Sequence, residues 1–371
     1  MPFDLGSFAL PSSESARSQV FLRSAAAAFT AFVVGLVVGP LVLRWLDRLK
    51  IRMAEDRGDS LRLDQMMKDR RNTPIMGGLI IVAALLISIA LCGDLANAYV
   101  ILAMLGAIGF CLIGMIDDCL KTAGRKGMNS GFKFVLQSLV ATALATGLLW
   151  VVKGRSELPQ DQALLHLNLP FTAFALDLSA AYGIPYVLVA TLVMVGTSNS
   201  VNLADGLDGL APGCMIIASA AFACIAFAVG RPDVSQQWSL LHVRGAQEMT
   251  VVAAALAGAT LAFLWFNSHP AEVFMGDTGS LCLGGLLGYI ALVTKQEILL
   301  IIVGGVFVVE ALSVILQVAS FRLRGGARVF RCAPLHHHFQ FGGMHEVKIV
   351  TRFWIVGLLC AILGLVVLKF G

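Results

Sequence analysis

Charged residues are scarce in this chain of 371 residues. Asp, Glu, Lys and Arg together make up 13% of it and hydrophobic residues 58%, whereas a soluble domain has about 25% charged residues. No Cys-x-x-Cys pair occurs among the eight dispersed cysteines, which are expected to pack as small apolar groups. No internal repeat is visible either. The composition therefore excludes an ordinary soluble protein and predicts a polytopic membrane protein.

Long apolar runs recur ten times, each close to the roughly 20 residues that a membrane-spanning helix needs. Two of them, the fifth and the eighth, are short, and the ninth contains Gly304-Gly305, so broken helices are expected in these three. The fold class predicted is an all-α polytopic integral membrane protein. The runs lie at about residues 25–46, 75–92, 98–116, 132–152, 184–200, 211–229, 249–267, 279–294, 298–320 and 349–369.

Basic residues gather on one side of these runs. An even number of spans puts both termini on the same side, and most of the 27 Lys and Arg residues fall in the loops on the other side, within 44–71, 121–133 and 322–352. The positive-inside tendency makes these loops cytoplasmic, so both termini are expected in the periplasm. Anionic lipid headgroups and an anionic substrate then explain the net charge of +4, and no nucleic-acid partner is needed.

The whole chain, residues 1–371, is expected to form a single transmembrane domain. Its longest periplasmic segment, about 153–183, contains the alternating stretch Leu165 to Leu169, which predicts a short hairpin. Cytoplasmic loops are placed at about 47–74, 117–131, 201–210, 268–278 and 321–348.

Three acidic clusters lie at the cytoplasmic ends of apolar runs. They are Asp117-Asp118, Asp205-Gly-Leu-Asp208 and Gly276-Asp277-Thr278-Gly279. Carboxylates near lipid are costly, and in membrane proteins they often mark a site of chemistry. All three share a side with the basic loops and with the His336-His337-His338 run. The sequence therefore predicts one cytosol-facing active site on a helical scaffold.

The first two clusters also have structural interpretations. Adjacent side chains on a helix diverge by about 100°, so Asp117 and Asp118 should face different partners, one the reaction and the other a lysine or a neighbouring helix. A lone pair of this kind is as often a solvated helix end with a surface ion pair. The segment Asn202 to Leu210 could equally be a turn before a helix that starts at Pro212.

The third cluster precedes the eighth run. Gly276 and Gly279 permit close backbone approach, and a helix beginning near Ser280 would point its positive end at a phosphate or a metal-phosphate complex. The alternative is that Asp277 or Thr278 only caps that helix. Both interpretations can hold together.

Carboxylates combined with a phosphate substrate favour Mg²⁺, which binds through one or two carboxylates and keeps the rest of its shell for phosphate and water. Zinc is disfavoured because no cysteine or second histidine group has metal-ligand spacing. Three successive histidines cannot all point one way, so at most two of His336 to His338 should reach a shared ligand. Glu310, deep in the ninth run, is assigned a structural role, hydrogen-bonded and tuning a bend near Gly304-Gly305.

Taken in order among ten spans, the motifs resemble one known family, the polyprenyl-phosphate N-acetylhexosamine-1-phosphate transferases. The resemblance covers nearly the whole chain. The histidine run and Thr73 to Gly78 resemble the branch that acts on muramoyl-pentapeptide donors. The motifs are Asp117-Asp118, Asn202 to Leu210, Asn267 to Ser280 and Pro334 to Phe339.

This resemblance implies transfer of phospho-MurNAc-pentapeptide from UDP-MurNAc-pentapeptide to undecaprenyl phosphate, giving lipid I and UMP, with Mg²⁺ as cofactor. It implies a multi-pass protein of the bacterial inner membrane, in contact with membrane lipids, that carries out the first membrane step of peptidoglycan synthesis. A homodimer is an expectation from the family alone.

The resemblance also implies roles for individual residues. Asp277 resembles the Mg²⁺ ligand, Asp117 the base or nucleophile, and Asp118 its essential neighbour. Direct attack by the lipid phosphate and a covalent phosphosugar intermediate both fit these residues. The positions that match substrate-binding residues are Lys68, Thr73, Lys121, Lys133, Asn202, Asp205, Gly206, Leu207, Asp208, Asn267, Phe274, His336 and His337.

Two other functions remain as alternatives. An N-acetylglucosamine-1-phosphate transferase acting on a polyprenyl phosphate would share the acids and differ in its donor. An ion-coupled transporter would place its acids near the membrane midplane between repeated halves, whereas these acids gather at one face.

Overall fold

The computed structural model describes residues 13–52, 73–123, 127–154, 165–168 and 175–370 of the chain. This part is almost entirely helical, and the all-α fold class is confirmed. The helices are α1 Ser13–Arg48, α3 Gly78–Cys92, α4 Ala98–Thr122, α5 Ser130–Lys153, α7 Ala180–Ala204, α8 Leu210–Val229, α9 Pro232–Gln237, α10 Glu248–Asn267, α11 Gly276–Val293, α12 Glu297–Val303, α13 Gly305–Leu323, α14 Leu335–Phe341 and α15 Glu346–Phe370.

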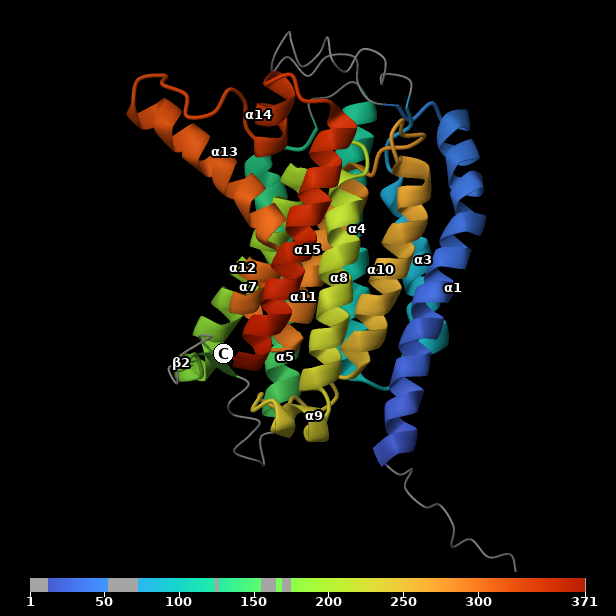
Figure 1. Ribbon diagram of the computed structural model, residues 1–371, viewed down its shortest axis with the longest axis vertical. Helices are drawn as coiled ribbons and strands as arrows, with labels where there is room; N and C mark the ends of the chain where they lie inside the picture. The colour runs from blue at the N-terminus through green and yellow to red at the C-terminus, as the bar shows by residue number, and fades with distance from the viewer. Residues whose placement is uncertain (1–12, 53–72, 124–126, 155–164, 169–174, 371) are drawn as a thin grey trace, which may run out of the picture.

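Within the described residues, nine helices are long and apolar enough to cross a membrane, and α3 is a shorter apolar helix of 15 residues. These ten follow the ten predicted runs in order. Helix α1 begins and α15 ends at the lower end of the bundle, opposite the end that carries α14 (Figure 1). Which end faces the cytoplasm stays a prediction.

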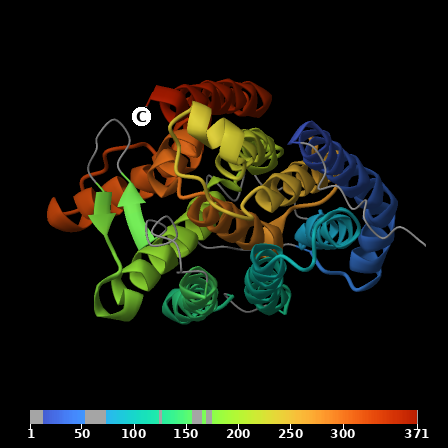
Figure 2. The same ribbon diagram turned by 90° about the horizontal axis from the view of Figure 1, so that it is seen from below.

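Helix α11 occupies the middle of the bundle. Its residues from Asp277 to Val293 are all buried, and the helix lies near the centre when the bundle is seen from below (Figure 2). Small residues allow this packing: a Cβ on Gly284 would lie 2.5 Å from the Thr197 carbonyl oxygen of α7, and one on Gly285 would lie 2.4 Å from the Phe110 ring of α4. Glycines let membrane helices approach backbone to backbone, as they do here.

The ninth run is broken, as its glycines predict. Helix α12 ends at Val303, α13 begins at Gly305, and α13 leans away from the bundle (Figure 1). The fifth run is not broken: the left-handed backbone of α7 at Ala181 and Tyr182 lies before residue 184, where the run begins. The eighth run is one unbroken helix of 18 residues.

A two-stranded antiparallel sheet lies between α5 and α7 in the chain. It pairs β1, His166–Asn168, with β2, Ala175–Asp177, in the register His166 to Asp177. The hairpin predicted from the alternating stretch at Leu165 to Leu169 is therefore confirmed.

Several helices extend beyond the predicted runs. Helix α4 continues to Thr122, α7 to Ala204, and α11 already begins at Gly276. As a result Asp117, Asn202 and Asp277 stand on helix ends rather than in the loops where the sequence placed them. Helical backbone fixes the direction of each side chain more firmly than a loop would.

Candidate active site

Three buried carboxylates and two lysines meet where α4, α5 and α11 come together. Asp117, Asp118 and Asp277 are 2%, 0% and 8% exposed, and one oxygen from each lies within 4.8 Å of the others. Lys121 is the cation placed among them: its Nζ lies 2.8 Å from Asp117, 3.7 Å from Asp118 and 3.1 Å from Asp277. Lys133 of α5 contacts Asp277 and lies 3.4 Å from Asp117. Buried carboxylates need such partners, because an isolated buried charge is very costly.

The two adjacent acids of α4 have different partners, as their divergence on the helix predicts. Asp117 faces Lys121 and Lys133, while Asp118 faces the first turn of α11. Oδ1 of Asp118 accepts the Asp277 N–H at 3.2 Å, and Oδ2 accepts the Thr278 N–H at 2.9 Å and the Thr278 hydroxyl at 2.7 Å. Asp118 therefore caps α11 from a neighbouring helix.

This arrangement corrects the prediction for the third cluster. The helix begins at Gly276 rather than near Ser280, and no side-chain cap comes from its own N-terminal residue. Neither Asp277 nor Thr278 caps it, because a cap accepts hydrogen bonds from the first-turn N–H groups, and here the Asp118 carboxylate does so. Two N–H groups that the sequence offered to a phosphate are thus already occupied.

Close backbone contacts hold the acids at these distances. A Cβ on Gly114 of α4 would lie 2.0 Å from the Asp277 carbonyl oxygen, and one on Gly78 of α3 would lie 2.1 Å from the Gly279 nitrogen. Residues 74–77, just before α3, are also hydrogen-bonded to this region. The Gly77 N–H donates to the Phe274 carbonyl oxygen, and the Phe274 N–H donates to the Pro74 carbonyl oxygen. Glycine at positions 78 and 114 is therefore a packing requirement of the site.

Asn202, in the last turn of α7, joins the same cluster. Its side-chain amide donates to Asp277 Oδ1 at 2.9 Å and to the Ser280 hydroxyl at 2.8 Å. Ser280 in turn donates to the Gly276 carbonyl oxygen. The Asn202 amide therefore helps to orient the Asp277 carboxylate from α7.

Hydrogen bonds to several other segments hold the loop between α7 and α8 in place. Asn267 accepts the Gly209 N–H and donates to the Val273 carbonyl oxygen, and it is 3% exposed. Asp208 lies 3.0 Å from the His269 ring nitrogen, and its backbone N–H donates to Glu346. The Trp354 indole N–H donates to the Gly209 carbonyl oxygen. These bonds hold the Asp208-Gly209 end of the loop beside α10 and α15.

The three histidines separate as predicted. His336 and His337 are buried, with ring centroids 4.2 Å apart, whereas the ring of His338 accepts the Arg331 N–H. His337 faces Gln340. A Cβ on Gly206 would lie 2.2 Å from the His336 Nε2, so the histidine run and the α7–α8 loop are in contact.

Glu310 is hydrogen-bonded, as expected, and its partner is His336. Its side chain is fully buried and contacts the His336 backbone N–H at 3.1 Å and Nδ1 at 3.2 Å. No sequence pattern signals this pairing, because the two residues are 26 positions apart on separate helices.

The remaining predicted residues surround these groups. Thr73 and Phe274 are half-buried, and Leu207 is buried; Asp205 is the C-terminal cap residue of α7. Lys68 lies outside the described residues. Sequence reasoning did not single out Ser280, Glu346 or Trp354. Ser280 follows Gly276 by four residues, or one helical turn, within a motif that the sequence analysis did recognise. That spacing could have indicated that Ser280 faces the same site.

The carboxylate cluster could hold a divalent metal. The oxygens of Asp118 are occupied by α11, which leaves Asp117 and Asp277 as the donors. Both currently pair with ammonium groups. Carboxylate oxygens are the ligands that a hard divalent cation prefers, so the residues present fit such an ion.

Fold and site together define a helical integral membrane enzyme with a carboxylate-lysine centre at one end of its bundle. The chain belongs to glycosyl transferase family 4, whose sequence profile matches residues 99–295. That span includes α4 through α11 and hence all three carboxylates.

Relatives extend the similarity along the chain. A phospho-N-acetylmuramoyl-pentapeptide-transferase of Maridesulfovibrio salexigens is 44% identical over 354 residues, covering 94% of each chain. Proteins of the same name from Solidesulfovibrio magneticus and Leptospira biflexa are 43% and 42% identical, over 94% and 95% of this chain and 94% of each relative.

Proposed function

We propose that this protein transfers phospho-MurNAc-pentapeptide from UDP-MurNAc-pentapeptide to undecaprenyl phosphate, producing lipid I and UMP. This is the first membrane step of peptidoglycan synthesis, carried out by a multi-pass protein of the bacterial inner membrane. The observation that carries the proposal is the buried centre of Asp117, Asp118 and Asp277 with Lys121 and Lys133, in a chain that is similar over 94% of its length to transferases of that name.

The charges at the centre suit a reaction between two phosphates. Lys121 and Lys133 each reach both Asp117 and Asp277, so substrate phosphate oxygens that displace a carboxylate meet cations already in place. Such preorganised charge is the main contribution a protein makes to phosphoryl transfer. In our proposal Asp117 takes the proton of the acceptor phosphate, and Asp118 keeps the start of α11 in register with α4.

The metal proposed is Mg²⁺, held by Asp277 together with the donor diphosphate. When bound, it would neutralise the charge that develops on the departing UMP. Asn202 supports this role because its amide fixes the orientation of the Asp277 carboxylate.

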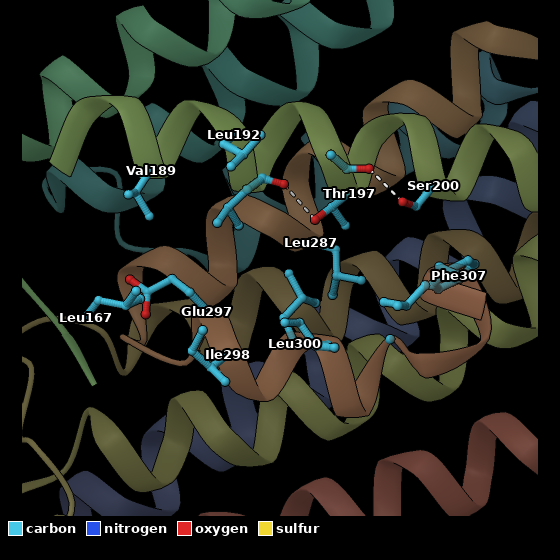
Figure 3. Close-up of a pocket in the computed structure, with 15 residues that line it drawn as sticks. Leu167, Val189, Leu192, Thr197, Ser200, Leu287, Glu297, Ile298, Leu300 and Phe307 are labelled. Atoms are coloured by element: carbon cyan, nitrogen blue, oxygen red, sulfur yellow. Dashed lines mark hydrogen bonds between the residues drawn. The ribbon is translucent and has the colours of Figure 1, made fainter. Parts of the chain in front are cut away.

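An apolar cavity supports a lipid acceptor. It has a volume of about 400 Å³ and lies between α7, α11, α12 and α13, with Val189, Leu192, Leu287, Leu300 and Phe307 around it (Figure 3). Its lining along α7 reaches Ser200, two residues before Asn202, which donates to Asp277. We propose that part of the polyprenyl chain occupies this cavity, so that its phosphate arrives at the carboxylates.

The residues around the α7–α8 loop are proposed to hold the UDP-linked donor. Asp205, Gly206, Leu207, Thr73, Lys68 and Phe274 would surround the nucleoside, and His336 and His337 the rest of the donor. Contact between Gly206 and the His336 ring supports a shared binding region for these two groups.

UMP release tests the proposal. Detergent-purified protein is given Mg²⁺, undecaprenyl phosphate and either UDP-MurNAc-pentapeptide or UDP-GlcNAc. Asp277→Ala is the variant, and Asp177→Ala, an exposed acid of β2, is the matched control. We expect UMP from the muramoyl donor alone, abolished by chelation and by Asp277→Ala and unchanged in Asp177→Ala.

The other outcomes each contradict part of the proposal. Release from UDP-GlcNAc alone would assign the protein to the sister transferases. No release from either donor, in a folded sample, would refute transferase activity. A labelled phosphosugar bound to the protein in the absence of the lipid acceptor would replace direct attack by a covalent mechanism.

A further inference from the structure

His336 ends in a polar atom for which the protein provides no partner. Its side chain is fully buried, and Nε2 has no hydrogen-bond partner among the residues that the structure describes. A buried polar atom left unsatisfied costs about 1–3 kcal/mol, so native structures rarely keep one without a reason. A ligand that supplies the missing partner is such a reason.

The other ring nitrogen is fixed. Glu310 accepts the His336 backbone N–H through Oε1, and its Oε2 faces Nδ1. The ionised form of this carboxylate can only accept hydrogen bonds, and paired with that form the imidazole carries its proton on Nδ1. In the neutral imidazole this leaves Nε2 as a hydrogen-bond acceptor.

Glu310 also fixes where the ring stands. Helix α14 has no side-chain cap from its own N-terminal residue, Pro334, and the Glu310 carboxylate of α13 accepts a hydrogen bond in its first turn instead. One side chain therefore sets the position of His336, and in its ionised form the tautomer as well. The two hydrogen bonds leave the ring little freedom to rotate.

The space before Nε2 lies under the α7–α8 loop. A Cβ at position 206 would lie 2.2 Å from Nε2, so the position requires glycine, whose backbone covers that side of the ring. Gly206 itself is half-buried, which places Nε2 just beneath the surface of the loop that the proposed function assigns to the donor. Donor binding at Nε2 would therefore require Gly206 to move aside, whereas the hydrogen bonds that fasten the loop lie at Asp208 and Gly209.

We propose that Glu310 is a positioning residue for the transferase reaction: it holds His336 in the Nδ1–H tautomer, so that Nε2 accepts a hydrogen bond from a hydroxyl or N–H group of the sugar-nucleotide donor. This inference rests on the proposed function and goes beyond it by giving Glu310 a role in recognition. It replaces the purely structural role expected from the sequence.

Glu310→Gln tests the tautomer with little change in shape. Its amide oxygen can still accept the His336 backbone N–H, but its NH₂ group then faces Nδ1 and drives the ring proton to Nε2. His336→Asn is the companion variant, because asparagine retains a donor near Nδ1 and has no atom at Nε2. Ser313→Ala, which removes a buried hydroxyl bonded to the Glu310 carbonyl oxygen, is the control on the same helix.

We expect kcat/KM for the UDP-linked donor to fall about 10- to 100-fold in Glu310→Gln, the loss of one good hydrogen bond, mostly through KM. The KM for undecaprenyl phosphate and the thermal stability should stay close to wild type, as should all values for Ser313→Ala. The double variant Glu310→Gln/His336→Asn should lose no more than His336→Asn alone, because Glu310 acts through His336. The proposal would be overturned if the losses of kcat/KM in the two single variants multiplied in the double variant. It would also be overturned if Glu310→Gln kept full activity.

A second measurement needs no variant to fold. In ¹⁵N-histidine-labelled wild-type protein without substrate, the His336 resonances should report a protonated Nδ1 and an unprotonated Nε2, and the donor should shift the Nε2 signal. A protonated Nε2 would refute the tautomer even if the enzyme is active. Absence of UMP release by wild type would instead refute the proposed function and leave the tautomer result standing.

Discussion

Replacing Asp118 by asparagine distinguishes the two adjacent carboxylates of α4. The Asp118 carboxylate accepts three hydrogen bonds from the first turn of α11, one on Oδ1 and two on Oδ2. Asparagine has a single acceptor oxygen. In its better orientation it keeps both bonds to Thr278 and turns its NH₂ group toward the Asp277 N–H, which then has no acceptor.

The expected cost follows from that one buried N–H group. An unsatisfied buried donor costs about 1–3 kcal/mol, and for a chain of this length, with an unfolding entropy of about 2.1 cal/mol/K per residue, that lowers Tm by about 1–4 °C. Asp117→Asn should leave Tm nearly unchanged, because an asparagine oxygen can still accept the Met128 N–H and because the two lysines that pair with Asp117 also contact Asp277. Both variants should lose UMP release, the Asp117 variant more completely.

Thermal unfolding in detergent and UMP release, measured on the same preparations, give the comparison. Thr278→Val removes one of the donors to Asp118, so its effect on stability should be less than additive with Asp118→Asn. Wild-type Tm in an inactive Asp118→Asn protein would refute the capping role and place Asp118 in the chemistry. Equal destabilisation by Asp117→Asn would refute the division of roles.

Three further predictions concern packing, loop anchoring and topology. Gly114→Ala should lower activity by about 10-fold or more, because its Cβ would lie 2.0 Å from the Asp277 carbonyl oxygen and displace a reacting group. The control Gly109→Ala, on the same helix, meets only the movable Val140 side chain and should retain activity. Equal activities of the two variants would show that α4 and α11 can separate freely. Asn267→Ala leaves the Gly209 N–H and the Val273 carbonyl oxygen without their partner. It should lower the free energy of unfolding by about 2–6 kcal/mol, with little change in donor KM among the molecules that remain folded. A donor-specific rise in KM at wild-type stability would assign Asn267 to the substrate instead. Cys119 is exposed and follows Asp118 directly. In a variant that keeps only this cysteine, a membrane-impermeant maleimide should label it from the cytoplasmic face. Labelling from the periplasmic face alone would reverse the predicted orientation.

Much of the fold can be predicted from the sequence because membrane insertion depends on local composition. A run of about 20 apolar residues satisfies its own backbone as a helix wherever it lies in the chain, so each of the ten runs forms a helix. The break in the ninth run follows from Gly304-Gly305, and the hairpin from alternation in five residues. The helix ends were less predictable, since polar residues such as Asn202 and Asp277 continue a helix only when another helix satisfies them.

The acids, lysines and histidines of the candidate site were also recognisable, because a carboxylate at the end of an apolar run is costly near lipid and is rarely kept there without a function. Their partners were not. That Asp118 caps α11, that Asn267 fastens two loops, and that Glu310 reaches His336 depend on contacts between residues 26 to 160 positions apart. The sequence by itself indicated which residues could react and predicted that they gather at one end of the helix bundle. Only the tertiary structure decided which carboxylate is committed to holding a helix and which is left for a substrate, because helix packing, and no local pattern, sets the distance between an acid and the N–H groups of another helix.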